Sequence, residues 1–339
     1  MKTRRMVWAC LAFWLASTAW VSTGTAAETL RFATGFSPMH TMQVKVFEPW
    51  ANKISEMTGG RIDVRMFPAG ALGKPATLYE LAEKGIADIA YTLHDYTPGR
   101  FPMTEVFALP YMTPGAEKTA AAMWNTYEQS ADFRKEYSQV KLLALFCHPG
   151  GDFHTTKRPI RSLDDLKGLK IRTASPYVTQ ALKIYGAIPI AMPITEAYSA
   201  LERGVVDGTV APWEGLGVFK LDDLTRFALE IDFYTMTMMV VMNQRKYDAL
   251  PADIRKAIDE TTGLTMSLAA GKAYDETDEP FKSRAVGKGI QINTLSDEEM
   301  GRLKGLTQPL RQEWVEKGSA KNLDAQAVLQ TALRLLELD

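Results

Sequence analysis

The chain has 339 residues, of which 46% are hydrophobic and 23% are charged, and its formal net charge at pH 7 is −1. This length is enough for two ordinary domains. A nearly neutral chain argues against a nucleic-acid partner, because nucleic-acid binders usually carry a basic patch.

The first 27 residues, 1–27, have the pattern of a secretory signal peptide. Lys2, Arg4 and Arg5 precede the apolar run MVWACLAFWLASTAWV, and the small-residue stretch STGTAA follows it. A transmembrane anchor is the alternative, but the apolar run is short and ends in a cleavage pattern. We therefore expect cleavage after Ala27 and a soluble, periplasmic protein.

The next residues alternate between strand and helix patterns. Strands are predicted at 28–36, 61–70 and 86–92, and helices at 42–60 and 76–85. This β-α-β-α-β order is typical of one half of a doubly wound α/β domain, with ligands at the carboxyl ends of the strands. A helical stretch around 114–137 and a strand at 139–148 follow.

The same order then repeats, with strands at 166–174, 187–193 and 205–211 and helices at 176–186 and 195–204. Thr195 can cap the second helix, and Gly204 can end it. The phrases LAEKGIADIA (81–90) and ALERGVVDGT (200–209) hold the same place in the two halves, where a helix ends at Gly and leads into a short strand. Chance recurrence of a common connection is the alternative to two facing lobes.

The remaining chain predicts connections between the lobes. The apolar run at 228–243 predicts a strand of 12 or more residues, which would span ~40 Å and could cross from one lobe to the other. A long helical pattern at 250–289 follows, broken only near Gly263 and Pro280. Several crossings would form a hinge.

After the leader, Cys147 is the single cysteine, so the mature chain has no intramolecular disulfide. Nothing near it in KLLALFCHPG marks an activated thiolate, and we expect a buried strand residue.

The run KRPIRSLDDLKGLKIRTASPYVTQALKIYGAIPIAMPITEAYSALERGVVDGTVAPWEGL (157–216) and VVMNQRKYDALPADIRKAI (240–258) resemble the solute-binding subunit of tripartite ATP-independent periplasmic (TRAP) transporters, the DctP family. The family's early strand, LRFATGFSP, is also in place. The resemblance implies a hinge-bent α/β fold of the two-lobed periplasmic-binding-protein type, with crossing strands and a long helix spanning both lobes. It further implies capture of an organic acid and docking on a permease of one small and one large membrane subunit, driven by an ion gradient.

The resemblance and the predicted elements together give the expected boundaries of the two lobes. The first lobe takes 28–150 and about 238–265, and the second takes 151–237 and about 290–318. An inter-lobe helix at 266–289 and a C-terminal helix at 319–339, packed on the lobes, complete the chain. We expect a monomer without a cofactor or metal ion.

Arg172 is the last residue of LKIR, in the strand whose carboxyl end lies at the edge where ligands of open α/β sheets bind. Its guanidinium can hold a carboxylate through two parallel hydrogen bonds. The resemblance assigns this arginine the role of carboxylate clamp, whereas the residue pattern alone also fits an exposed arginine at the end of a strand. Ser175 fits either a ligand contact or the cap of the next helix.

Relatives that bind sialic acid have polar or aromatic residues at three places where this chain departs from them. The chain has Thr209, Val210 and Ala211 after VDG, Ile194 at the usual stacking position, and GGDF at 150–153 in place of a second arginine. These departures argue against a sugar acid as the ligand.

Aromatic and polar residues at the predicted strand ends are the other candidate ligand contacts. They are Trp213 in the second lobe and Phe36, Tyr91 and Thr92 in the first. An apolar pocket with a few placed polar groups is the usual design of a small-ligand site. For the aromatic residues, core packing is the alternative.

The histidines suggest enzymatic chemistry only weakly. His148 and His154 stand six apart, and His40 and His94 fall in the first lobe, but no zinc motif, nucleophile elbow or phosphate loop is present. We expect His154 and His40 to contact the ligand and no catalytic residue.

The sequence thus predicts a binder of a small organic acid, with an aromatic or hydrophobic monocarboxylate favoured. A 2-oxo or 2-hydroxy acid binder is the alternative, with Glu214 able to support a cation. A periplasmic enzyme or a sensor subunit on the same fold remains open as well.

Overall fold

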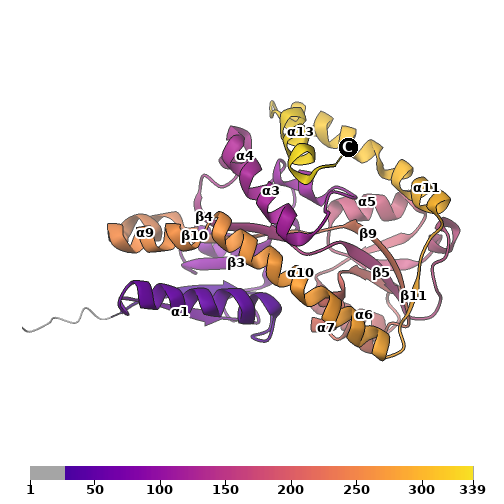
Figure 1. The fold of residues 1–339 in the computed structure, drawn as a ribbon, viewed down its shortest axis with the longest axis horizontal. Coiled ribbons are helices and arrows are strands. Elements are labelled where there is room, and N and C mark those ends of the chain that lie inside the picture. Colours follow the sequence, from indigo (N-terminus) through magenta and orange to yellow (C-terminus); the bar gives the residue numbers. More distant parts are fainter. Residues whose placement is uncertain (1–26, 339) are drawn as a thin grey trace, which may run out of the picture.

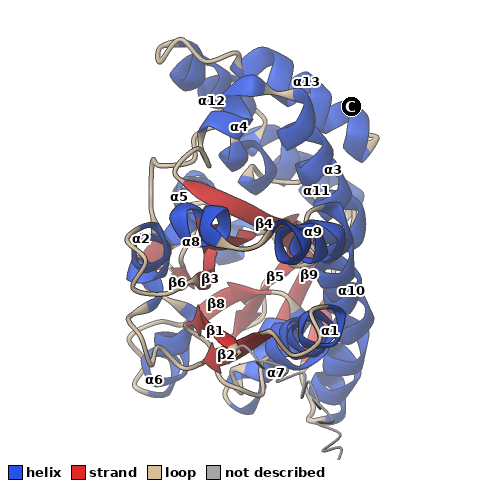
Figure 2. Cartoon of the chain, turned by 90° about the vertical axis from the view of Figure 1, so that its left-hand side faces the viewer, coloured by secondary structure: helices blue, strands red, loops and turns tan. Residues whose placement is uncertain are grey.

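The structure is a computed structural model that describes residues 27–338. Apart from its last residue, the predicted signal peptide therefore lies outside the described residues. The described chain forms a five-stranded and a six-stranded sheet, each covered by helices (Figures 1 and 2). No helix within residues 27–338 is both long enough and apolar enough to cross a membrane.

The first lobe is built on the sheet with the order β2-β1-β3-β10-β4. Strand β1 runs parallel to β2 and β3, whereas β10 is antiparallel to β3 and β4. The strands are β1 (Glu28–Thr34), β2 (Ile62–Phe67), β3 (Ile89–Leu93), β4 (Val140–Cys147) and β10 (Thr237–Asn243). The helices are a π-helical turn (Gln43–Phe47), α1 (Glu48–Met57), α2 (Leu78–Glu83), α3 (Ala116–Gln129), α4 (Ala131–Lys135), α8 (Gln244–Ala249) and α9 (Ala252–Thr261).

The second lobe is built on the sheet with the order β11-β9-β5-β8-β6-β7. Its strands are β5 (Gly151–Thr155), β6 (Lys170–Thr173), β7 (Ile188–Ala191), β8 (Gly208–Ala211), β9 (Phe227–Tyr234) and β11 (Gln291–Asn293). Its helices are α5 (Pro176–Ile184), α6 (Ala197–Glu202) and α7 (Trp213–Val218). Short 3-10 helices occur in both lobes: they lie at Pro75–Thr77, His94–Tyr96 and Thr104–Ala108 in the first, and at Leu163–Leu166, Ile194–Glu196 and Leu221–Asp223 in the second.

The repeated phrase has a common structural cause in both lobes. Gly85 and Gly204 have positive φ values of 76° and 69° at the ends of α2 and α6. An aspartate three residues later binds the neighbouring strand: the Asp88 carboxylate accepts from Arg31 N at 2.8 Å, and that of Asp207 accepts from Lys170 N at 2.9 Å. In each lobe the motif therefore ends a helix and sets the start of a parallel strand pair.

Two expectations about the helices are wrong. Thr195 does not cap the helix that follows it, because a 3-10 turn occupies Ile194–Glu196 and α6 begins after Glu196 without a side-chain cap. Pro280 does not interrupt the long helix, since α10 runs unbroken from Leu264 to Gly287.

The apolar run at 228–243 forms two strands instead of the single long strand predicted. Strand β9 belongs to the second sheet and β10 to the first, and residues 235–236 connect them. Beside them, residues 148–150 carry the chain from β4 to β5. The Thr235 hydroxyl donates to the His148 carbonyl oxygen at 2.5 Å, so the two crossings are tied together.

Helix α10 runs from one lobe to the other (Figure 1). Near its middle, the Asp275 carboxylate accepts from the backbone N–H groups of Ala116 and Glu117 in the first lobe. One turn later, Asp278 accepts from Glu214 N in the second lobe at 2.8 Å. The helix therefore passes from one lobe to the other between these two aspartates.

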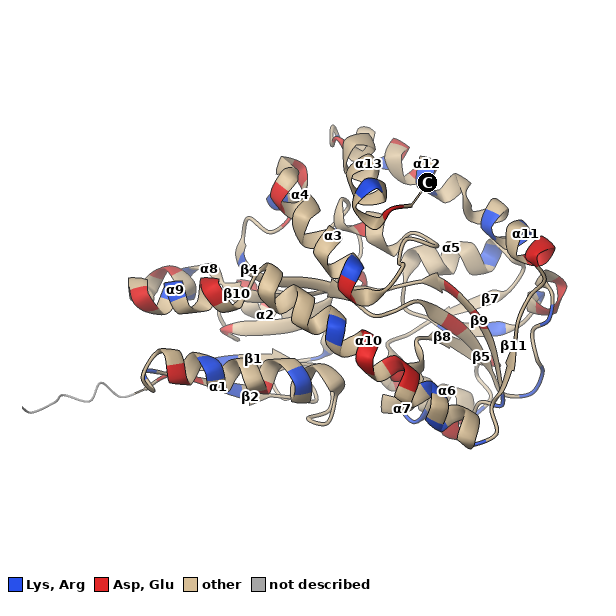
Figure 3. Ribbon diagram, viewed as in Figure 1, with Lys and Arg blue, Asp and Glu red and all other residues tan. Residues whose placement is uncertain are grey.

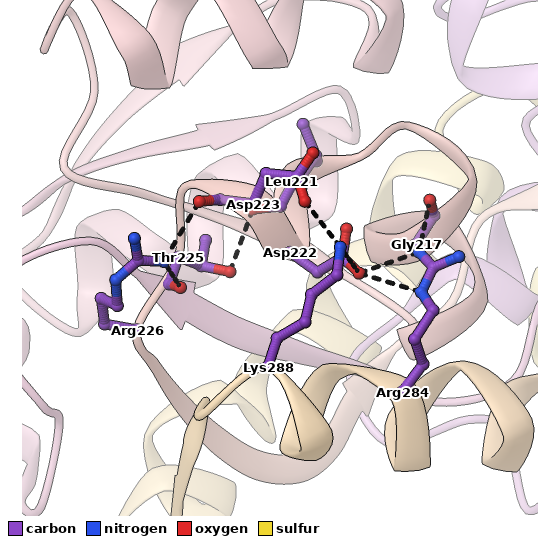
Figure 4. A network of polar contacts seen from close by, with 8 residues as sticks. All are labelled: Gly217, Leu221, Asp222, Asp223, Thr225, Arg226, Arg284 and Lys288. Carbon is purple, nitrogen blue, oxygen red and sulfur yellow. Dashed lines mark hydrogen bonds and ion pairs between the residues drawn. The ribbon is translucent and has the colours of Figure 1, made fainter.

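The far end of α10 is held by an ionic network on the second lobe (Figure 4). The fully buried Asp222 carboxylate accepts from Arg284 Nη2 and from Lys288 Nζ, each at 2.8 Å. Arg284 Nη2 also donates to the Gly217 carbonyl. This network binds the helix end to α7 and to the turn that follows it.

The C-terminal helices are α11 (Asp297–Thr307), α12 (Pro309–Ser319) and α13 (Ala325–Leu336). Helix α11 packs on α5, and the Trp314 indole of α12 donates to the Pro102 carbonyl at 2.8 Å, so α12 reaches back to the first lobe. Helix α13 packs on α3 and α12. Acidic and basic residues are interspersed along α9, α10 and α11, as the colours of the ribbon in Figure 3 show.

Candidate functional site

A pocket lies between the two sheets. Residues of both lobes and of α10 line it: Phe36, His40, Leu93, Tyr96, His148, Arg172, Ile194, Pro212, Glu214, Gly215, Phe219, Tyr234, Met236, Met238 and Tyr274. Of the sequence-predicted ligand contacts, Arg172, Phe36, His40 and Ile194 belong to this lining.

Arg172 stands on β6, between β7 and β8 in the second sheet. Its side chain is 1% exposed. The Nε–H group donates to the Met192 carbonyl oxygen at 3.0 Å, which fixes the guanidinium, whereas Nη2 is buried and has no hydrogen-bond partner. The burial lowers the pKa of Arg172.

A buried guanidinium that is not paired with an anion is costly, because it has lost its hydration without a compensating charge. The lining contains no other arginine and no lysine. The pocket therefore offers one strong site for an anion, and a planar carboxylate matches the planar guanidinium.

Two tyrosines stand beside Arg172, Tyr96 from the first lobe and Tyr234 from the end of β9. Burial raises the pKa of each, and the nearby Arg172 charge partly opposes this rise. Tyr234 fits here because residue 151 is Gly: a Cβ at that position would lie 2.2 Å from the tyrosine ring. Gly151 of the GGDF stretch thus makes room for an aromatic ring.

His148 lines the pocket from the crossing between β4 and β5. Its Nε2 accepts from Met236 N at 3.0 Å, so the proton is on Nδ1, which faces the Pro149 carbonyl at 2.5 Å. Burial lowers the pKa of His148 to about 4. The ring is therefore neutral and fixed by backbone groups.

His40 and Phe36 form part of the first-lobe wall. Their rings stack with centroids 4.6 Å apart, and both rings contact Phe219 of the second lobe. His40 Nδ1 accepts from Met42 N at 3.2 Å, which leaves the proton on Nε2. Burial lowers the pKa of His40 to about 3, so its ring is neutral.

Glu214 is the one carboxyl group in the lining, and its side chain is 2% exposed. Its Oε1 accepts from the Thr41 hydroxyl of the first lobe, so this hydrogen bond joins the two lobes beside the pocket. Burial raises the pKa of Glu214 to about 7, and Thr41 opposes the rise.

Two expected ligand contacts lie outside the lining, in the second lobe. The Trp213 indole packs among the apolar residues between α6 and α10 and donates to Glu230 Oε1 at 3.3 Å. His154 lies on β5, where its Nε2 is 3.1 Å from the Ala211 carbonyl and its ring meets the edge of Trp213.

Three further expected contacts lie behind the pocket wall. The Tyr91 ring packs against Phe36, and its hydroxyl is 3.2 Å from that of Tyr274. The Thr92 hydroxyl donates to the Pro75 carbonyl. Ser175 caps α5 by accepting from Val178 N at 3.5 Å, which was the alternative considered for it.

Several lining residues were missed from the sequence. Tyr96 follows β3 by three residues, and His148, Tyr234 and Met236 stand at the crossings, so the predicted inter-lobe connections were the signal that could have found them. Tyr274 lies on α10, where the helical pattern alone gave no signal. Among residues 27–338, no group of three or more His, Cys, Asp and Glu side chains is arranged to hold a metal ion.

Comparison with solved structures gives two close likenesses. A TRAP solute-binding protein from Rhodoferax ferrireducens T118, in complex with copurified benzoate, is 36% identical, with a TM-score of 0.88 and coverage of 92% of this chain and 98% of that one. A TRAP solute-binding protein from an unidentified marine microbe, specific for aromatic acid ligands and in complex with metahydroxyphenylacetate, is 33% identical, with a TM-score of 0.87 and coverage of 91% and 98%.

The curated relatives agree with these structures. The C4-dicarboxylate-binding periplasmic protein DctP of Rhodobacter capsulatus is 27% identical over 281 residues, which are 82% of this chain and 83% of that relative. The family model of bacterial extracellular solute-binding proteins, family 7, matches residues 32–317. The two-lobed fold and the periplasmic location implied by the sequence are thereby confirmed. The chain belongs to the DctP family of extracellular solute-binding proteins, the periplasmic binding proteins of TRAP transport systems.

Proposed function

We propose that this protein captures an aromatic or hydrophobic monocarboxylate and delivers it to a TRAP permease of one small and one large membrane subunit. Arg172 holds the carboxylate while the lobes close over the ligand. The observation that carries this proposal is the buried Arg172 guanidinium, whose Nη2 lacks a partner in a pocket of otherwise mostly apolar surface.

The lining supports a ligand with one carboxylate and an apolar body. Phe36, Phe219 and Ile194 surround the pocket, so an aromatic ring would gain ~25 cal/mol for each Å² of apolar surface buried. A second carboxylate would find no second cation in the lining. A sugar acid would lose ~1–3 kcal/mol for each hydroxyl buried without a partner.

The two close structural relatives support the same ligand class, since one holds benzoate and the other is specific for aromatic acids. We propose a carrier in preference to an enzyme, because the relatives named above are solute-binding proteins.

Isothermal titration with benzoate tests this function. We expect Arg172→Ala to weaken binding by ~3–5 kcal/mol, about 10²–10⁴-fold, because the ligand's carboxylate would be buried unpaired. The apo variant should unfold at no lower temperature than the wild type, since it loses an unpaired buried charge.

Arg203→Ala is the matched control. Arg203 is exposed near the end of α6 in the same lobe, and its Nε donates to the Ser199 carbonyl. This variant should bind benzoate as the wild type does. A folded Arg172→Ala protein with an affinity within about threefold of the wild type, a difference below ~1 kcal/mol, would refute the clamp.

A further inference from the structure

Glu214 gives the pocket a second polar group, held by other partners than those of Arg172. The two side chains share no hydrogen bond or ion pair, and they act on different neighbours. Burial raises the pKa of all four neighbouring tyrosines; the Arg172 charge opposes this rise at Tyr96 and Tyr234, whereas the Glu214 charge adds to it at Tyr91 and Tyr274.

The Glu214 carboxyl group has one oxygen engaged and one available. Oε1 accepts from Thr41, and the backbone N–H of Glu214 donates to Asp278 at 2.8 Å, which fixes the residue. No hydrogen bond to Oε2 is present among the described residues. A carboxyl group that lines an apolar pocket with a free oxygen is an acceptor awaiting a donor.

The chemistry around Glu214 limits what the ligand carries there. A second carboxylate would be repelled by Glu214. Burying an ammonium group here would be costly. It would lose its hydration among apolar side chains such as Phe219 and Met238, and only the Glu214 carboxyl group could compensate for that loss. A hydroxyl group needs only one acceptor, which Glu214 supplies.

We propose that Glu214 is a specificity-determining residue that accepts a hydrogen bond from a hydroxyl on the ligand's ring. The preferred substrates are then ring-hydroxylated aromatic monocarboxylates. This inference rests on the proposed function, in which Arg172 holds the carboxylate.

The test is isothermal titration of benzoate and its 2-, 3- and 4-hydroxy derivatives. We expect the better of the 3- and 4-hydroxy acids to bind about 10- to 100-fold more tightly than benzoate, the range of a hydrogen bond to a charged group. The 2-hydroxy acid is the internal control, because its hydroxyl lies beside the carboxylate that Arg172 holds and should bring no such gain.

Glu214→Met removes the acceptor and keeps the side-chain length. It also removes the hydrogen bond from Thr41, so it should weaken benzoate binding about as much as Thr41→Val does, and its preference for the hydroxy acid should fall below about twofold, a few tenths of a kcal/mol. Glu214→Gln keeps a neutral acceptor, and it should retain a reduced preference. This second variant decides the question if the methionine variant does not fold.

Thr41→Val separates recognition from lobe closure. It removes the hydrogen bond between the lobes and leaves Glu214 in place, so it should weaken all four acids by the same factor. A hydroxyl preference that survives in Glu214→Met, or is lost only in Thr41→Val, would overturn the inference. Benzoate binding without any hydroxyl preference would refute this inference alone, whereas no binding of any of the four acids would refute the proposed function as well.

Discussion

Burial fixes the charge of individual residues around the pocket. His40 and His148 are neutral because burial lowers their pKa values to about 3 and about 4. Arg172 is therefore the one fixed cation in the lining. The carboxyl groups show the opposite shift, since burial raises the pKa values of Glu214 and of Asp278 to about 7.

Asp278 should make the protein less stable as the pH rises. Its carboxyl group keeps its proton in the folded protein up to about pH 7 but loses it near pH 4 when unfolded. The unfolded state therefore binds fewer protons between these values, and the free energy of unfolding falls as the pH rises through this window. Asp278→Asn removes this loss while its amide oxygen still accepts from Glu214 N.

We expect Asp278→Asn to gain roughly 1–3 kcal/mol over the wild type between pH 5 and pH 8. Thermal unfolding at the two pH values measures this difference, and Glu279→Gln, exposed on the same helix turn, is the control. An equal change with pH in the wild type and Asp278→Asn would mean that Asp278 titrates normally.

The candidate site could be predicted from the sequence only in part, for a reason visible at two adjacent residues. The pattern placed Trp213 and Glu214 correctly at the end of a strand. It could not give the rotation of the short helix that begins there, which turns Trp213 into the core and Glu214 into the pocket. Arg172 was found through the family resemblance, because the residue pattern alone also fits an exposed arginine at the end of a strand.

Among the elements, the strands and helices of the repeated phrases were predictable because glycine ends each helix. The break between β9 and β10 was not, since residues 233–243 are all buried and include no Gly or Pro that would mark a break. The continuity of α10 was also hidden. Pro280 is exposed and has no backbone N–H group, so α10 continues through it with one intrahelical hydrogen bond fewer.

Helix α10 approaches α3 closely at Gly271, and this contact gives a stability prediction. A Cβ at Gly271 would lie 2.7 Å from the Ala116 carbonyl oxygen and 2.6 Å from Glu117 Cα. Both atoms belong to the backbone and cannot rotate away. We expect Gly271→Ala to destabilise the protein by about 1–3 kcal/mol in denaturant unfolding.

Gly287→Ala, in the last turn of α10, is the matched control. A Cβ there would meet no atom within 4 Å. Alanine favours a helix over glycine, so this variant should be neutral or more stable by up to about 1 kcal/mol. Equal effects of the two substitutions would show that the contact with α3 contributes nothing.

At the scale of the whole molecule, the contacts between the two lobes could not be predicted from the sequence. Contacts such as the one between the Tyr177 hydroxyl and Glu105 Oε2, at 3.0 Å, join residues 72 positions apart. With the Thr41–Glu214 hydrogen bond and the packing of Phe36 on Phe219, they hold the two lobes together around the pocket. Such pairings depend on how closed lobes meet, and strand and helix patterns do not specify that.

The most direct test of the central claim is a crystal structure of the protein with bound benzoate. The account predicts the ligand's carboxylate on the Arg172 guanidinium, with an oxygen about 2.7–2.9 Å from Nη2 and the ring between Phe36, Ile194 and Phe219. A carboxylate bound elsewhere, with Nη2 of Arg172 still unpartnered, would contradict it.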